Sequence, residues 1–180
     1  MNGFGDVYGA MVTIKLNTWV NAPVERCFKL ATSIEFHIAS ARPMKEKAVS
    51  GVTSGLLHEG DKVKWRARHF LVQLTHTSLV EVSKPFSHFR EVMIAGIFAR
   101  YEHEHFFAAM DDGTRVRDEL KFAAPFGPLG RMMEKLVMRR YMTSLLKRRN
   151  TALKRAAESD EWRVYLNGEP EVAVVAANPR

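Results

Sequence analysis

Residues 100–123 of this chain read RYEHEHFFAAMDDGTRVRDELKFA, two segments of alternating apolar and polar residues joined by an Asp-Gly pair. Such a pair between alternating segments is a strong signal for a two-residue β-hairpin turn. With Asp112 and Gly113 as the turn, one side of the hairpin carries charges, including Glu104 opposite Lys121, an attractive pair. The other side is mostly apolar, and we expect it to face the protein interior.

That apolar side also carries three ionisable residues. In the predicted register Phe107 faces Asp118 and His105 faces Leu120, so that His103, His105 and Asp118 all point inward. The two histidines lie about 6–7 Å apart along one strand face. Burying an unpaired polar group costs about 1–3 kcal/mol, so the cluster requires an explanation.

Three interpretations of this polar cluster stay open. The three side chains satisfy one another and buried water inside a filled core. Alternatively they line a cavity and form hydrogen bonds with a mostly apolar guest. In the third interpretation His103, His105 and Asp118 bind a metal ion, as such residues do in zinc sites. Because no other spacing in the sequence supports a metal, we predict no metal and no cofactor.

The rest of the chain extends the hairpin into a sheet. Alternating segments separated by short turns predict an antiparallel meander of about six to seven strands. Asn21-Ala22-Pro23 ends the first strand and begins one of two short helices. After Pro128 the apolar spacing becomes three and four, which predicts one long helix to Ala157. This helix is the only element long enough to cover the sheet, so the fold class is α+β. The other predicted strands are 13–20, 45–53, 62–68, 70–82 and 89–95, and the short helices are 24–31 and 34–40.

Composition restricts the chain to the class of globular proteins with a full core. Its 180 residues are 46% hydrophobic and 26% charged, too apolar for disorder and too charged for a membrane bundle. The first twenty residues lack the pattern of a secretory signal, and the single cysteine, Cys27, excludes an internal disulfide. We therefore expect a cytoplasmic protein. The expected segments are an extension over 1–11, the domain over 12–157 and an acidic tail over 158–180.

The net charge of +7 is concentrated in the long helix, where residues 127–157 carry nine Lys or Arg and one Glu. This basic face is either an ordinary solvated helix surface, partly neutralised by the acidic tail, or a contact for an anionic membrane. Nucleic acid is not expected as a partner, because the helix has no interleaved aromatic residues and no known reading motif.

Between sheet and long helix we predict a cavity for a small hydrophobic molecule. Its polar anchors are His103, His105 and Asp118. His76 shares the apolar parity of its strand and joins this set, unless it is a satisfied core histidine. The predicted apolar walls are Trp65, Phe107, Leu120, Phe122, Met133, Leu136 and Val137.

Several segments resemble a known superfamily. Residues 21–28, NAPVERCF, resemble the APxExVF opening of START-like proteins, the group also called SRPBCC, which includes polyketide cyclases and birch-pollen-allergen-like proteins. Later segments are similar to the pattern GPF…HxHxF…GTxxxD…PxGxLG of a bacterial ligand-binding SRPBCC subgroup, although Ile97 replaces its proline. These segments are Gly96–Phe98, His103–Phe106, Gly113–Asp118 and Pro125–Gly130.

The resemblance covers residues 12–157 and implies a helix-grip fold, in which the last helix crosses a curved sheet over an apolar cavity. Because the superfamily mixes carriers and enzymes, the resemblance leaves catalysis undecided. We expect a carrier or sensor of a lipid, polyketide-like or aromatic molecule. One alternative is a cyclase-like or dehydratase-like enzyme that uses His103 or His105, oriented by Asp118, as acid or base. Another is a peripheral lipid-handling protein that contacts anionic membranes. The oligomeric state is left open.

Overall fold

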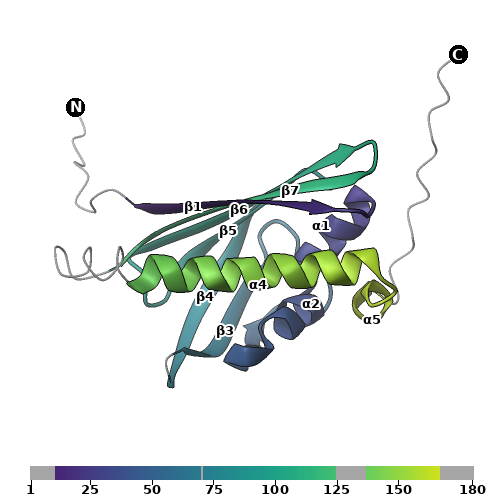
Figure 1. The fold of residues 1–180 in the computed structure, drawn as a ribbon. Helices are drawn as coiled ribbons and strands as arrows, with labels where there is room; N and C mark the ends of the chain where they lie inside the picture. Colours follow the sequence, from purple (N-terminus) through teal and green to yellow (C-terminus); the bar gives the residue numbers. More distant parts are fainter. Residues whose placement is uncertain (1–10, 70, 125–136, 167–180) are drawn as a thin grey trace, which may run out of the picture.

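The computed structural model describes residues 11–69, 71–124 and 137–166, and it confirms the α+β class and the helix-grip arrangement (Figure 1). Seven antiparallel strands form one sheet in the order β1-β7-β6-β5-β4-β3-β2. The strands are β1 (Val12–Val20), β2 (Lys47–Gly51), β3 (Lys62–His69), β4 (Val72–Lys84), β5 (His88–Ala95), β6 (Arg100–Met110) and β7 (Gly113–Ala123).

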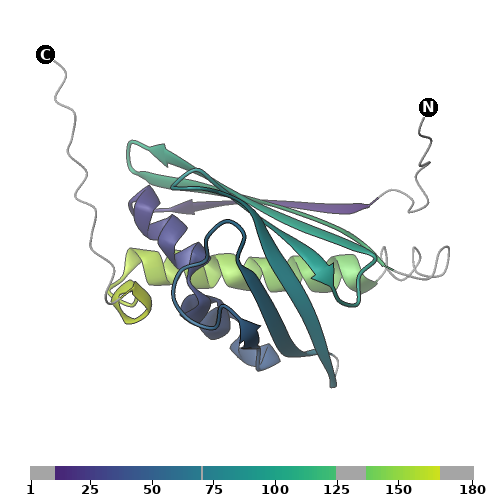
Figure 2. The same ribbon diagram turned by 180° about the vertical axis from the view of Figure 1, so that it is seen from behind.

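The long helix α4 (Arg139–Glu158) lies across one face of the sheet, and the two views from opposite sides show the sheet curving around it (Figures 1 and 2). The short helices α1 (Val24–Thr32) and α2 (Ile34–Ser40) and the 3-10 turn η1 (Arg42–Met44) follow β1. A further helix, α5 (Trp162–Leu166), follows α4 and contacts α1. No described helix is long and apolar enough to cross a membrane.

The two short helices begin and end where the local sequence predicts. Pro23 occupies the N-cap of α1, immediately before its first turn. Ser33 separates α1 from α2, and its side chain accepts a hydrogen bond from the backbone N–H of Phe36 at 3.2 Å. A serine side chain at this position satisfies a helix donor that has no partner within the helix. The chain therefore turns there, so that α1 contacts β6 and β7 while α2 contacts β2.

The hairpin between β6 and β7 has the predicted faces but not the predicted register. Gly113 pairs with Met110, so the turn residues are Asp111 and Asp112 rather than Asp112 and Gly113. Gly113 has a φ of +150°, and a Cβ there would lie 2.3 Å from the carbonyl oxygen of Val20. Glycine is thus required by the close approach of β1. Because the shift equals two residues, every side chain keeps its face.

The shift changes the partners on the inner face. His105 now lies directly opposite Asp118, and His103 lies opposite Leu120. The prediction that placed Asp118 opposite Phe107 is therefore wrong, and the direct pairing brings the Asp118 carboxylate next to both histidines.

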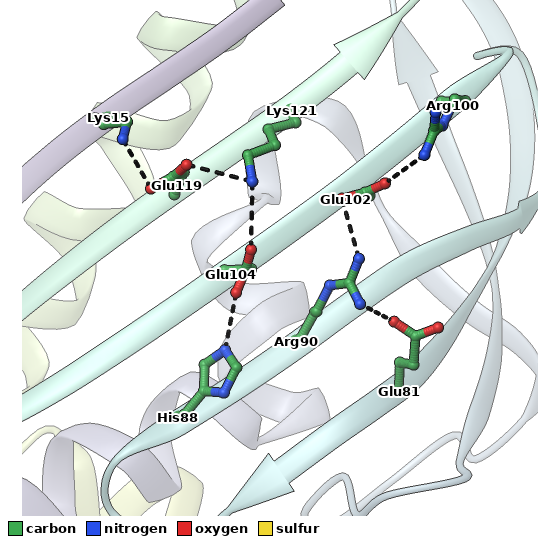
Figure 3. Close-up of polar contacts among 9 residues, drawn as sticks. All are labelled: Lys15, Glu81, His88, Arg90, Arg100, Glu102, Glu104, Glu119 and Lys121. Carbon is green, nitrogen blue, oxygen red and sulfur yellow. Dashed lines mark hydrogen bonds and ion pairs between the residues drawn. The ribbon is translucent and has the colours of Figure 1, made fainter. Parts of the chain in front are cut away.

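The outer face of the sheet is covered by charged side chains (Figure 3). Glu104 forms an ion pair with Lys121 at 3.6 Å across strands β6 and β7, although the register places the two residues diagonally rather than opposite. Lys121 also pairs with Glu119 at 3.4 Å, and Glu119 with Lys15 at 3.1 Å. A second chain of ion pairs joins Arg100, Glu102, Arg90 and Glu81. These pairs lie at the surface with their carboxylates partly buried, and surface pairs contribute about 0–1 kcal/mol each, so the stability of the sheet depends mainly on its inner face.

Candidate functional site

A cavity of about 190 Å³ lies between the inner face of the sheet and α4. The strands supply most of its wall, from Trp65, His69, Leu74, Thr75, His76, Ser78, Glu91, Met93, Tyr101, His103 and Leu120. The connection between β5 and β6 adds Ile97 and Phe98, and the segment from α2 to β2 adds His37, Met44 and Glu46. Helix α4 and the residue before it close the cavity with Met138, Tyr141, Met142, Leu145, Leu146 and Arg149.

The residues predicted to form the site occupy three kinds of position. Four of them line this cavity: Trp65, His76, His103 and Leu120. Four more are buried but are not among the residues that line it: His105, Phe107, Asp118 and Phe122. Val137 is 41% exposed and is not part of the described wall, whereas Met133 and Leu136 lie outside the described residues.

The inner polar cluster is centred on Asp118. One oxygen of its carboxylate, Oδ1, is 3.2 Å from Nε2 of His103 and 2.7 Å from Nδ1 of His105. The other oxygen, Oδ2, accepts a hydrogen bond from Asn150 of helix α4 at 2.6 Å. Asn150 also donates to Oγ1 of Thr18 at 3.0 Å. This network joins β1, β6, β7 and α4 below the cavity.

The protonation of the cluster follows from its burial. Burial alone would raise the pKa of Asp118, but the two histidines outweigh that effect and hold the pKa far below its usual range. Asp118 is therefore an ionised carboxylate that only accepts hydrogen bonds. Burial, and then the neighbouring His105, lower the pKa of His103 to about 4, against the opposing effect of Asp118. His103 is consequently neutral at pH 7.

Glu91 of β5 completes this end of the cavity. A bulge in the pairing of β5 could turn its side chain to the other face of the sheet. An irregularity does occur between β4 and β5, where Ser78 pairs with Met93 and Thr77 with Ala95, but Glu91 still faces inward opposite His103. Among the described residues, Glu91, His103 and His105 form a buried group whose spacing suits a metal ion.

A second polar cluster in the cavity wall is formed by His37, Glu46 and Arg149. His37 stacks on the Trp65 ring with 4.0 Å between centroids. Nη2 of Arg149 lies 3.0 Å from Nδ1 of His37, and Nε2 of His37 lies 3.1 Å from the Glu46 carboxylate. Because a guanidinium only donates, Nδ1 must accept, and the Nε2–H then donates to Glu46. Nearby, Nδ1 of His69 is 2.6 Å from the Tyr141 hydroxyl.

The buried Glu46 carboxylate should make stability depend on pH. Burial would raise the pKa of Glu46, but His37 and then Arg149 lower it to about 2, below the value of about 4.3 in an unfolded chain. This contribution to stability is complete above the unfolded pKa and is lost as the pH falls towards 2. The unfolding constant should change by up to about tenfold per pH unit for this one proton.

Urea unfolding of wild type and Glu46→Gln across this acidic range checks the expectation. The wild type should lose stability more steeply than the variant on acidification. Parallel curves would show that Glu46 is not linked to folding.

Sequence reasoning missed His37, Glu46, Arg149 and Asn150. For Asn150 a signal existed, because it lies four residues after Leu146 and three before Leu153 on the apolar stripe of the helix. A polar residue on a buried face needs a partner, which here is Asp118. The cluster of His37, Glu46 and Arg149 has no sequence signal, since folding alone brings these distant positions together.

Much of the positive charge of α4 is engaged within the chain. Arg149 binds His37, Lys154 pairs with Glu158, and Arg155 binds Glu161. Four other basic residues of the helix are exposed: Arg139, Arg140, Lys147 and Arg148. Contact with an anionic membrane through these four side chains stays a prediction.

A curved antiparallel sheet, a long C-terminal helix across it and a cavity between them define the helix-grip fold of START-like, or SRPBCC, proteins. Solved structures agree. Protein TTHA0849 from Thermus thermophilus superposes with a TM-score of 0.63 and 22% identity, covering 81% of this chain and 99% of that one.

Two further structures share the fold. The aromatase/cyclase ZhuI from Streptomyces sp. R1128 has a TM-score of 0.64 and 14% identity, over 83% of this chain and 98% of its own. Ara h 8.0201 has a TM-score of 0.55 and 12% identity, over 79% of this chain and 97% of its own. No protein-family model and no curated protein matches the sequence. At these identities the similarity shows the fold alone.

Proposed function

We propose that this protein binds a small hydrophobic molecule, in the size range of one or two fused rings, in the cavity between its sheet and α4. The observation that carries this proposal is the cavity itself, with a volume of about 190 Å³ and mainly apolar walls. For comparison, an apolar cavity of about 150 Å³ in another protein binds benzene. The volume here therefore suits an aromatic guest of modest size.

The residues that line the cavity include apolar side chains, which would give affinity for a guest, and polar side chains, which would orient it. Four methionines line it, Met44, Met93, Met138 and Met142, and their flexible thioethers can adapt to guests of different shape. Two groups of polar side chains belong to the wall, His103 with Glu91 and His37 with Glu46. An apolar wall with few polar groups is typical of small-molecule sites, where burial gives affinity and the polar groups give orientation.

Binding of 2-naphthol tests the proposal, because this fluorescent probe has two fused rings and one hydroxyl. We expect a Kd on the order of 10 µM from its small number of atoms. Met142→Trp should weaken binding by at least about tenfold, because the larger ring fills the cavity from α4. Fluorescence titration of wild type and variant measures both values.

Met110→Trp is the matched control, since Met110 is 48% exposed in the strand next to the β6–β7 turn. This variant should bind the probe as the wild type does. Equal weakening in both variants, or no saturable binding by the wild type, would contradict a guest in this cavity.

Native mass spectrometry of the freshly purified protein, followed by denaturing extraction, addresses the natural guest. A stoichiometric adduct that Met142→Trp no longer carries would support a carrier and identify the chemical class. An adduct retained equally by Met142→Trp would place the guest elsewhere and contradict the proposal.

The enzyme alternative has one specific observation in its favour. His103 lines the cavity and lies 3.2 Å from the Asp118 carboxylate, which can orient its ring for proton transfer to or from a guest. Turnover of a cyclisable polyketide-like substrate that is lost in His103→Gln while binding persists would favour this alternative over a simple carrier.

A further inference from the structure

Three buried side chains meet at the end of the cavity that Asp118 supports. Glu91 of β5 lies opposite His103 of β6, and His105 follows two residues later on the same face. Each side chain offers a ligand atom, and these atoms lie within 4.8 Å of one another. His103 is only 1% exposed, and Glu91 and His105 are each 6% exposed. The group is therefore almost completely removed from solvent.

Each histidine of this group has one nitrogen in use and one without a partner. Asp118 accepts hydrogen bonds from Nε2 of His103 and Nδ1 of His105. Nδ1 of His103 and Nε2 of His105 are buried and have no hydrogen-bond partner among the described residues. Leaving a buried polar atom unpaired costs about 1–3 kcal/mol. Two such atoms in a group that also contains the buried Glu91 carboxylate point to a ligand-binding role for these side chains.

The hydrogen bonds to Asp118 also prepare the histidines chemically. Because Asp118 only accepts, the two nitrogens that face it must carry hydrogens. In a neutral imidazole the opposite nitrogen then carries the lone pair, as a metal ligand requires. A carboxylate that holds ligating histidines from behind is a common feature of metal sites, where it fixes the tautomer and strengthens the ligand. Asp118 is itself held by Asn150 of α4.

We propose that Glu91, His103 and His105 bind one divalent transition-metal ion, with Asp118 as the supporting carboxylate. Two imidazoles and one carboxylate are a known zinc ligand set that leaves a fourth position open. The same set with open positions also suits other first-row ions such as iron(II). The charge of a divalent ion would be balanced by the carboxylates of Glu91 and Asp118.

The sequence-based prediction was that no metal is bound, and the proposed site also differs in two respects from the metal-binding interpretation considered there. Asp118, considered there as a ligand, stands behind the histidines instead, and Glu91 supplies the carboxylate. Glu91 and His103 line the cavity. The open position of the metal therefore faces the cavity, where it would take a water molecule or an oxygen atom of a bound guest. The inference goes beyond hydrophobic binding and does not depend on it.

Zinc titration of protein freed of metal by a chelator tests the proposal. Calorimetry with a competing chelator should give one ion per chain with a Kd of about 1 µM or tighter. His103→Gln, His105→Gln and Glu91→Gln should each weaken binding at least about 100-fold, and Asp118→Asn by about 10–100-fold. His88→Gln is the control, because His88 lies on the same strand as Glu91 but pairs with Glu104 on the outer face.

A second measurement on the wild type keeps the test valid if a variant fails to fold. In ¹⁵N spectra of the histidine rings, zinc should shift Nδ1 of His103 and Nε2 of His105, while the nitrogens that face Asp118 keep their hydrogens. No saturable zinc binding by the wild type would overturn the proposal, as would unchanged signals of these two nitrogens or an equal loss in His88→Gln. Neither experiment uses 2-naphthol, so failure of the metal site and failure of the apolar cavity are distinguishable.

Discussion

Asp118→Ala should lower the free energy of unfolding by about 3–5 kcal/mol, the usual cost of removing one partner from a buried ionic network. The substitution removes the acceptor of two histidine N–H groups and of the Asn150 amide, at 2.6–3.2 Å. These donors stay buried, because His103 and Asn150 are fixed by their own strand and helix. Urea unfolding in the presence of a chelator measures the change without any contribution from metal.

Glu119→Ala is the matched control for this substitution. Glu119 is the next residue on β7 but lies on the outer face, where it pairs with Lys15 and Lys121 (Figure 3). Exposed pairs contribute about 0–1 kcal/mol, so this variant should remain close to the wild type. Comparable losses in the two variants would show that the Asp118 network does not hold α4 against the sheet.

Trp65→Ala should also cost about 3–5 kcal/mol, as expected when a large buried aromatic side chain is removed. Trp65 is 1% exposed, stacks on His37 and donates from Nε1 to the Ser78 hydroxyl at 3.0 Å. Because its ring lines the cavity, its removal should also enlarge the space available to a guest. Chemical unfolding measures the first effect, and titration with a three-ring analogue of 2-naphthol measures the second.

Trp19→Ala provides the control within the same residue type. Trp19 lies on β1 and is 44% exposed, so its loss should cost less than about 1 kcal/mol. Trp65→Phe, which keeps a ring but loses the donor to Ser78, should fall between the two, at about 1–2 kcal/mol. If Trp65→Ala were as stable as Trp19→Ala, the wall around Trp65 would not be tightly packed.

Local patterns were sufficient for the strands, the short helices α1 and α2 and their faces, whereas α5 was not predicted. Alternation from Arg100 to Ala123 predicts two strands with one apolar face, and both strands form. The register could not be read in the same way, because Asp111-Asp112 and Asp112-Gly113 are both acceptable turns. The close approach of Val20 to Gly113 accompanies the first of them, and that contact involves a strand more than ninety residues earlier.

The inner cluster was predictable in its members and not in its geometry. His103, His105 and Asp118 were found because polar residues at apolar positions stand out in an alternating strand. Their hydrogen bonds depend on the register, and Glu91 joins the group only through the pairing of β5 with β6. When two strands are not joined by a tight turn, their pairing leaves no periodic pattern in the sequence of either strand. The sequence therefore does not show which residues face each other.

The α+β class, the order of the elements and the inward face of the β6–β7 hairpin all follow from the amino-acid order, because they depend on short-range periodicity and turn chemistry. The surroundings of the cavity depend instead on how the elements pack. His37, Glu46 and Arg149 meet there from three separate segments, and Asn150 of α4 reaches Asp118 of β7. Such contacts form because burial brings distant polar groups to one place, where each must find a partner away from water.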